Sequence, residues 1–477
     1  MKTCLLIGRW FGLLAGLSFC HVAQVAAAAE SVEQAPAAIP GHPPASAGML
    51  IDKVWSGHPV RFALLTERGH QFIAYYDAER RITVAGRKLS ETNWARVKPE
   101  GVLVPERKRM SNVTGWDTHN YLTLALDRDG CLHLSGNMHA DPLVYYRTRK
   151  PFDLTTLERL DRMTGERERR TTYPAFSRSP DGELIFKYRD GGSGNGSDFY
   201  NVYDPVTHSW RRLFDGPLLE GQGERSAYGT GPRHGPDGLY HMLWMWRDTP
   251  DAMSNHTLSY ARSRDLKNWE SSAGKPIARP ITMAKAEVID AAKPGSGLVN
   301  MTYALGWDAN QRPMAAYHRY DTNGQSQIFV ARADGRGGWQ ARQLSDWKFR
   351  WEFPGGGSQV KQVSVNAPAP DAKGNLVVEY SAKQAGAGRW RLDAETLGVL
   401  EQLPPAKRVS GEDAPRPRGQ HPGLQVQTVT SQSEGRRWVL RWETLGVNRD
   451  LANRDVPPPS ELRLQELPET KNRWNRS

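Results

Sequence analysis

Two histidines, two tyrosines and two arginines recur at related positions in one stretch of this 477-residue chain. They are His119, His139, Tyr173, Arg189, Tyr228 and Arg247. Arginine can bind a carboxylate through its planar fork, and histidine or tyrosine can accept and return a proton. The set contains no pair of carboxyl groups, which glycoside hydrolysis usually needs. These residue types therefore indicate proton transfer beside a bound anion.

The set fits β-elimination on a uronic acid. This reaction removes the proton on C5 and breaks the bond to the oxygen on C4. Because the C5 proton is weakly acidic, cations and hydrogen-bond donors must stabilise the charge that develops on the neighbouring carboxylate. One histidine or tyrosine then takes the C5 proton, and another protonates the leaving oxygen. We therefore expect an acidic sugar as substrate.

Taken singly, each of these residues has a structural explanation. His119 in WDTHN could hydrogen-bond a carbonyl, Tyr173 could be a packing aromatic, and Arg247 could pair with Asp248. His133, in the alternating segment CLHLS, is expected to be a core histidine rather than a site residue. A functional interpretation depends on the fold bringing the six residues together.

A turn residue followed by a short apolar segment occurs seven times along the chain. The turns are at Gly69, Gly130, Gly182, Gly238, Gln311, Gly374 and Gly435. The shortest step between them is 52 residues, from Gly130 to Gly182, and the longest is 73, from Gly238 to Gln311. A β-rich repeat of this length is typical of propeller blades. We expect an all-β, seven-bladed β-propeller that forms a single domain.

The repeat predicts where the six residues lie. Each turn joins two antiparallel strands, so the start of the first strand lies beside the end of the second. The six residues flank three successive turns, at separations of seven to eleven residues. We therefore expect all six on one rim of the propeller, on three neighbouring blades, where a ligand groove would lie.

The two ends of the chain differ in composition from the repeat. Residues 1–29 resemble a cleavable signal peptide, with an apolar stretch too short to span a bilayer. Residues 30–48 form a Pro/Ala-rich linker, 49–467 the propeller, and 468–477 a polar tail. Near the end of the propeller range, the alternating segment ELRLQEL is compatible with a closing strand and equally with a loose end of the chain. We expect a secreted or periplasmic protein without a membrane span.

The net charge and the cysteine content limit which molecules and metal ions the protein is expected to bind. The formal net charge of +11 could attract a polyanion, or it could serve only to keep a secreted protein soluble. Because no nucleic-acid motif is present, the expected partner is an acidic polysaccharide and not a nucleic acid. We also expect the protein to be a monomer. Signal cleavage would leave Cys131 alone, so no disulfide or cysteine-based zinc site can form. His234, His241 and His256 are weak metal candidates, and we expect neither metal nor cofactor.

The glycine-rich run GGSGNG at 191–196 is not a phosphate-binding loop, since no helix and no lysine follow it. It predicts a sharp turn that passes close to a ligand or to a neighbouring blade.

Several of these motifs together carry a family resemblance. The segments are WDTHNYLTLALDRDGCLHLSGNMHADPLVYYRT (116–148), YPAFSRSPDGELIFKYRDGGSGNG (173–196), ERSAYG (224–229) and WMWRDTP (244–250). They resemble the BNR-type seven-bladed propellers that include ulvan lyases and the related L-rhamnose-α-1,4-D-glucuronate lyases. The resemblance is strongest between about residues 110 and 270. It implies metal-independent β-elimination on a glucuronate-containing polysaccharide.

The resemblance also implies roles for individual residues. Arg189 and His139 would hold the substrate carboxylate, and Tyr173 and His119 would act as acid and base; which of these two takes the C5 proton stays open. Tyr228 matches the second tyrosine of the family's active site.

Two further residues, Asn137 and Arg247, would contact neighbouring sugars. One departure from the family pattern is the segment between His139 and Tyr173, which is shorter than in characterised lyases.

Two other functions remain open from the sequence. A sialidase-like glycoside hydrolase would need an inward carboxyl pair, or an arginine triad with a tyrosine nucleophile. A non-catalytic propeller would use the same groove only to bind an acidic glycan. The exact polymer, its sulfation and endo or exo cleavage are not specified by these motifs.

Overall fold

The computed structural model describes residues 48–406 and 416–467 of the chain. Contacts divide the chain into Met1–Ala45 and Ser46–Ser477, and every described residue belongs to the second unit. The predicted signal peptide, nearly all of the linker and the tail lie outside the described residues. No helix in the described ranges is long and apolar enough to cross a membrane.

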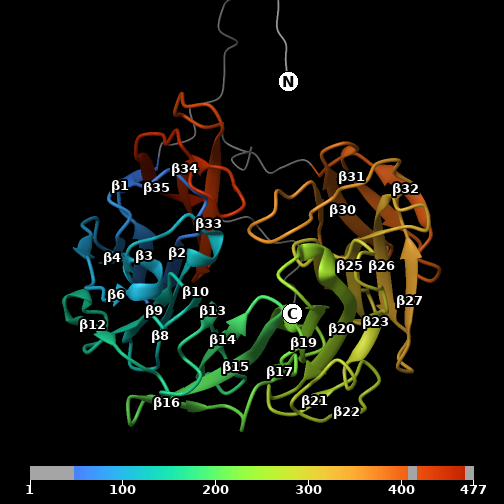
Figure 1. Ribbon diagram of the computed structural model, residues 1–477, viewed down its shortest axis with the longest axis horizontal. Helices are drawn as coiled ribbons and strands as arrows, with labels where there is room; N and C mark the ends of the chain where they lie inside the picture. The colour runs from blue at the N-terminus through green and yellow to red at the C-terminus, as the bar shows by residue number, and fades with distance from the viewer. Residues whose placement is uncertain (1–47, 407–415, 468–477) are drawn as a thin grey trace, which may run out of the picture. The chain divides into compact units, whose positions relative to one another are not determined.

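The described residues form seven antiparallel sheets of four or more strands (Figure 1). The first sheet contains β2 (Ala63–Glu67), β3 (His70–Tyr76), β4 (Ile82–Lys88) and β5 (Ala95–Val97). The second contains β8 (Leu122–Leu126), β9 (Leu132–Gly136), β11 (Tyr145–Thr148) and β12 (Leu157–Leu160). The third contains β10 (His139–Asp141), β13 (Thr171–Arg178), β14 (Leu184–Gly192), β15 (Asn195–Asp204), β16 (Ser209–Arg212) and β17 (Leu219–Glu220). The fourth contains β18 (Ser226–His234), β19 (Tyr240–Arg247), β20 (Asn255–Ser263), β21 (Trp269–Glu270), β22 (Pro276–Ile277) and β23 (Glu287–Asp290).

The later sheets follow the same plan. The fifth contains β24 (Tyr303–Trp307), β25 (Pro313–Tyr320), β26 (Ser326–Ala333) and β27 (Trp339–Gln343). The sixth contains β28 (Val363–Val365), β29 (Ala369–Pro370), β30 (Leu376–Ala382), β31 (Gly386–Leu392) and β32 (Val399–Leu403). The seventh contains β33 (Leu424–Ser433), β34 (Arg436–Leu445), β35 (Ser460–Leu467) and β1 (Met49–Val54). A small ribbon joins β6 (Leu103–Val104) to β7 (Arg109–Met110). The described helices are short 3₁₀ turns: η1 (Pro105–Arg107), η2 (Thr118–Asn120), η3 (Leu154–Thr156) and η4 (Ala252–Ser254).

This arrangement confirms the predicted all-β propeller. All seven predicted turn residues have positive φ, from +62° at Gln311 to +94° at Gly130, as tight hairpin turns require. The alternating segment ELRLQEL forms the closing strand β35, which pairs with β34 on one side and with β1 on the other. The seventh sheet therefore joins strands from the two ends of the described chain.

The hydrophobic core lies between neighbouring sheets. Phe62, just before β2, stacks on Trp442 of β34 with ring centroids 4.3 Å apart, which ties the first sheet to the seventh. Trp244 and Trp246 of β19 are fully buried between the third and fourth sheets. This packing makes the strand ends rigid supports for the loops that they carry.

Candidate active site

A β-bulge places Tyr173 at the start of β13. Thr172 pairs with Arg189 and Ala175 with Lys187, so Tyr173 and Pro174 together stand opposite a single residue of β14. Tyr173 has φ +59°, a conformation that a bulky residue rarely adopts. Bulges turn a side chain away from the regular pleat, and strained backbone is often retained at functional sites. The phenol is thereby directed toward the end of the neighbouring sheet.

The two predicted histidines stack on each other beside this bulge. His119 lies in η2, just before β8, and His139 begins β10. Their ring centroids are 3.9 Å apart with an interplanar angle of 21°. Both side chains are partly exposed, at 18% for His119 and 30% for His139. A ligand above this rim can therefore reach both rings.

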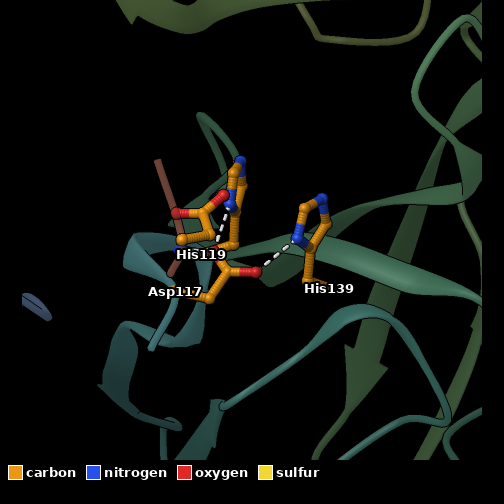
Figure 2. A group of neighbouring side chains, drawn as sticks. Asp117, His119 and His139 are labelled. Atoms are coloured by element: carbon orange, nitrogen blue, oxygen red, sulfur yellow. Dashed lines mark hydrogen bonds and ion pairs between the residues drawn. The ribbon is translucent and has the colours of Figure 1, made fainter. Parts of the chain in front are cut away.

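Asp117 holds both histidines, and the sequence interpretation missed it. One carboxylate oxygen lies 2.5 Å from His119 Nδ1 and the other lies 2.5 Å from His139 Nδ1 (Figure 2). Burial alone would raise the pKa of Asp117, but the hydrogen bonds and charges of the two imidazoles hold this pKa well below its usual range. The carboxylate stays ionised, so Nδ1 of each histidine carries a proton and Nε2 lies on the side of the ring away from Asp117.

His119 Nε2 and the Tyr173 hydroxyl lie 3.1 Å apart. Burial and the neighbouring Tyr228 raise the pKa of Tyr173, while the positive charges of Arg189 and Arg247 oppose that shift. The phenol is therefore protonated near neutral pH, and it can donate to Nε2 of His119 when that ring carries its proton on Nδ1 alone. Asp117, His119 and Tyr173 form one line of hydrogen bonds with the phenol at its outer end.

Arg189 lies behind the two tyrosines rather than at the surface. Its side chain is 1% exposed, with the guanidinium carbon 4.9 Å from the Tyr173 ring centroid and 5.6 Å from that of Tyr228. It donates hydrogen bonds to the Tyr228 hydroxyl at 3.1 Å and to Thr172 Oγ1 at 3.2 Å. In this arrangement its positive charge acts on a ligand through the tyrosines.

The GGSGNG run forms the hairpin between β14 and β15, as predicted. Ser193 Oγ lies 2.5 Å from the Tyr228 hydroxyl, so the hairpin contributes directly to the cluster. Gly194, at φ +77°, approaches the next sheet so closely that a Cβ there would stand 2.7 Å from Thr249 Cα. Only glycine fits this contact without displacement.

Two predicted substrate contacts point into the protein instead. Asn137 is 3% exposed and its amide donates to the carbonyls of Ser111 and Val113 at 2.7 and 2.9 Å. Arg247 is 8% exposed; its Nε donates to the carbonyl of Thr249, and its guanidinium carbon lies 5.2 Å from the Tyr228 ring centroid. Both residues brace the loops around the cluster, and their contacts with neighbouring sugars stay predictions.

A second carboxylate, Asp450, completes the surroundings of the histidines. It lies between β34 and β35, and its Oδ2 accepts a hydrogen bond from the backbone N–H of Ser358 at 3.0 Å. Its Oδ1 is buried and has no hydrogen-bond partner among the described residues. No local sequence motif marks this residue, because it reaches the site from the far end of the chain.

Asp117, His119, His139 and Asp450 each offer one possible metal-ligand atom, and these atoms lie within 4.8 Å of one another. A tetrahedral zinc ion, with bonds of about 2.0–2.2 Å, would separate its ligand atoms by roughly 3.3 Å. The 2.5 Å contacts between Asp117 and each imidazole are shorter than that and fit shared protons better.

The other histidines considered from sequence have separate partners. His241 contacts Tyr260 and Asp237, and His256 contacts Asp248, so neither belongs to a group of metal-binding donors among the described residues. His133 is fully buried and contacts Asp127 and Tyr145, as expected of a core histidine.

The structure thus brings His119, His139, Tyr173, Arg189, Tyr228 and Arg247 into one continuous cluster, and adds Asp117, Ser193 and Asp450 to it. The chemical roles assigned to these residues stay predictions.

Comparisons with known proteins agree with this architecture. The polysaccharide lyase Uly1 has a similar fold, with a TM-score of 0.55 and 15% sequence identity over 89% of this chain and 94% of that one. An ulvan lyase bound to -[GlcA(1-4)Rha3S]- gives a TM-score of 0.55 and 12% identity over 87% and 97% of the two chains. A search of curated proteins found no significant match. The family of BNR repeat-containing proteins matches residues 70–347, more than half of the sequence, and the chain therefore belongs to the BNR repeat-containing family.

Proposed function

We propose that this protein is an exported polysaccharide lyase that cleaves glucuronate–rhamnose linkages by β-elimination. The observation that carries the proposal is the line from Asp117 through His119 to Tyr173, with the cation of Arg189 behind the phenol. This arrangement supplies a proton acceptor, a proton donor and positive charge on one rim.

The proton pathway follows from the hydrogen bonds. Because Tyr173 is protonated at rest, its oxygen can take the C5 proton only as its own proton passes to His119 Nε2, 3.1 Å away. The electrons of the C5–H bond form the C4=C5 double bond as the C4–O bond breaks. The leaving oxygen then takes a proton from Tyr173, which recovers the one held on His119. The ionised Asp117 stabilises His119 while it is cationic.

The substrate carboxylate requires positive charge and hydrogen-bond donors during this step. His139 is 30% exposed, and its Nε2 can donate a hydrogen bond to the carboxylate when the ring carries a proton on both nitrogens. Tyr228 receives a hydrogen bond from Arg189, which polarises its hydroxyl toward donation. Arg189 thus stabilises the charge on the substrate carboxylate indirectly, through Tyr228, whereas His139 contacts the carboxylate itself.

The substrate class is proposed from chemistry and from fold likeness together. A uronate carboxylate suits the cationic cluster, and the similar ulvan lyase was solved with a glucuronate–rhamnose sulfate bound. Export is proposed from the signal-like sequence at residues 1–29.

One observation favours glycoside hydrolysis as a second candidate. Asp117 and Asp450 offer carboxylate oxygens within 4.8 Å of each other, and hydrolases use such pairs. The strongly lowered pKa of Asp117, caused by its hydrogen bonds to both histidines against the effect of burial, makes it a poor general acid. Elimination is therefore the better-supported reaction.

Digestion of ulvan and gum arabic in ¹⁸O-labelled water separates the two reactions. Elimination leaves an unsaturated uronate and transfers no solvent oxygen to either product, as mass spectrometry of the fragments would show. Hydrolysis would place one labelled oxygen in a product and would reject the proposal. Binding without new fragments would leave a glycan-binding propeller.

A further inference from the structure

An arginine-rich loop lies beside the candidate active site and takes no part in the chemistry proposed above. It covers residues 161–170, between β12 and β13, and contains Arg162, Arg167, Arg169 and Arg170. Together with Arg159 of β12 and the hairpin between β14 and β15, it lines a cavity of about 850 Å³.

A buried glutamate gives this loop a fixed shape without using the arginines. Glu168 is 8% exposed. Its carboxylate accepts hydrogen bonds from the backbone N–H groups of Met163 at 3.1 Å, Thr164 at 2.8 Å and Gly165 at 3.2 Å. These bonds satisfy the carboxylate and hold the turn, so the arginines extend from a pre-formed support.

Most of the positive charge in the cavity lacks a partner. Arg162 and Arg169 are exposed, and their side chains make no hydrogen bond or ion pair with any residue in the described ranges. Arg167 comes no closer than 3.9 Å to Asp190. Four carboxylates also line the cavity: Asp161, Glu168, Asp190 and Glu220. Arg159 already pairs with Asp161, and Glu168 is occupied by backbone, so free guanidinium groups exceed free carboxylates.

Strand register places the cavity on the same rim as the candidate active site. Thr171 pairs with Asp190, and the next pair along the strands is Thr172 with Arg189 of the cluster. Asp190 lines the cavity, whereas the neighbouring Arg189 faces Tyr173 and Tyr228. Because successive side chains of a strand point to opposite faces, β14 carries one site on each face at this end.

The hairpin connects the two sites. The terminal nitrogen of Arg170 lies 2.9 Å from the point where a Cβ on Gly192 would stand. The next residue, Ser193, contacts the Tyr228 hydroxyl at 2.5 Å. A polysaccharide bound at the tyrosines therefore has an arginine-lined cavity across the width of one hairpin.

We propose that this cavity is a second anion subsite, which binds another acidic group of the same polysaccharide chain. The inference rests on the proposed function and deepens it. Guanidinium forks bind the planar carboxylate of a uronate, or a sulfate ester on a neighbouring sugar, through paired hydrogen bonds. The subsite selects for chains with acidic groups at more than one sugar.

The test is a double variant, Arg162→Gln with Arg169→Gln, because both side chains are exposed and unpaired within the described structure. Arg336→Gln is the matched control, since Arg336 is an exposed arginine on the hairpin between β26 and β27 of another sheet. We expect KM on ulvan to rise about five- to twenty-fold in the double variant, mainly by loss of binding. The control should change KM less than twofold.

The length and the sulfation of the substrate are then varied to identify the acidic group that the cavity binds. The rise in KM should shrink on a fragment too short to reach the cavity. If it persists on desulfated ulvan, the loop binds a uronate carboxylate; if it disappears there, the loop binds a sulfate ester. An unchanged KM on every long substrate, or an equal change in the control, would overturn the subsite.

Calorimetric binding in a Tyr173→Phe background separates this inference from the proposed function. Weaker binding of ulvan by the loop variant would support the subsite even if the wild-type protein released no unsaturated product. Equal binding of ulvan by Tyr173→Phe with and without the two loop substitutions would reject the subsite while leaving elimination untouched. If neither protein bound ulvan, the subsite would also be rejected.

Discussion

Replacing Asp117 by asparagine should damage turnover far more than it damages the fold. The carboxylate accepts three hydrogen bonds: from the backbone N–H of His119 at 2.8 Å, and from Nδ1 of His119 and of His139 at 2.5 Å each. An asparagine has one carbonyl oxygen, so it can accept from one imidazole only. The NH₂ group of the asparagine would face Nδ1 of the other imidazole. Because NH₂ can only donate, that ring would have to carry its proton on Nε2.

The expected loss follows from this tautomer change. In Ser-His-Asp triads, the same substitution keeps the geometry and lowers kcat about 10⁴-fold. Asp117 is less enclosed, with its side chain 19% exposed, so we expect kcat/KM to fall about 10³-fold, or about 4 kcal/mol. The assay is initial-rate release of unsaturated product from ulvan, with the melting temperature measured on the same sample.

Asp237→Asn provides the matched control. Asp237 contacts the buried His241 at 2.9 Å, in the turn between β18 and β19 away from the cluster. This variant should keep kcat/KM within about threefold, because its histidine takes no part in the proposed chemistry. If Asp117→Asn stays folded and retains more than a tenth of wild-type kcat/KM, the assignment of Asp117 as the residue that orients both histidines is wrong.

Three further outcomes follow from the same structure. Tyr173→Phe should lower turnover at least about 10³-fold while calorimetric binding of ulvan changes less than threefold, because only the proton-carrying hydroxyl is lost. The pKa of Asp117 is lower in the folded protein than in the unfolded chain, so its ionised form stabilises the fold above the unfolded pKa of about 3.9, and this stabilisation is lost as pH falls through the folded pKa. The free energy of unfolding, measured with urea between about pH 5 and pH 2, should therefore fall more steeply with decreasing pH for wild type than for Asp117→Asn. Gly194→Ala should lower both the melting temperature and turnover, since its Cβ would stand 2.7 Å from Thr249 Cα, whereas Gly374→Ala, with similar φ but open space around it, should affect only stability.

Local sequence signals predicted the propeller well because each hairpin is specified by its own residues. A turn residue with positive φ and an alternating apolar segment determine a pair of strands without distant contacts. The repeat then placed His119, Tyr173 and Tyr228 on one rim, since hairpin register relates strand ends directly. The alternation at 460–467 allowed a closing strand for the same reason, and the structure decides between that strand and a loose end.

The parts that the sequence did not predict depend on contacts between distant segments. Asp450 reaches the histidines from the last sheet, and nothing near it in sequence indicates that position. The burial of Arg189 beneath two rings is set by the packing of the third sheet on the fourth, so its motif alone indicated a carboxylate clamp and not this burial. The backbone contacts of Asn137 were also not visible in its motif, because a buried amide that holds backbone carbonyls looks the same in sequence as one that binds a sugar.

The most direct test of elimination is ultraviolet absorbance over time, with purified protein on ulvan and, separately, on gum arabic. The proposed reaction predicts rising absorbance from the C4=C5 double bond on at least one of these glucuronate–rhamnose substrates, and little rise with Tyr173→Phe. A flat trace accompanied by new reducing ends would contradict elimination and would favour hydrolysis by the Asp117 and Asp450 pair.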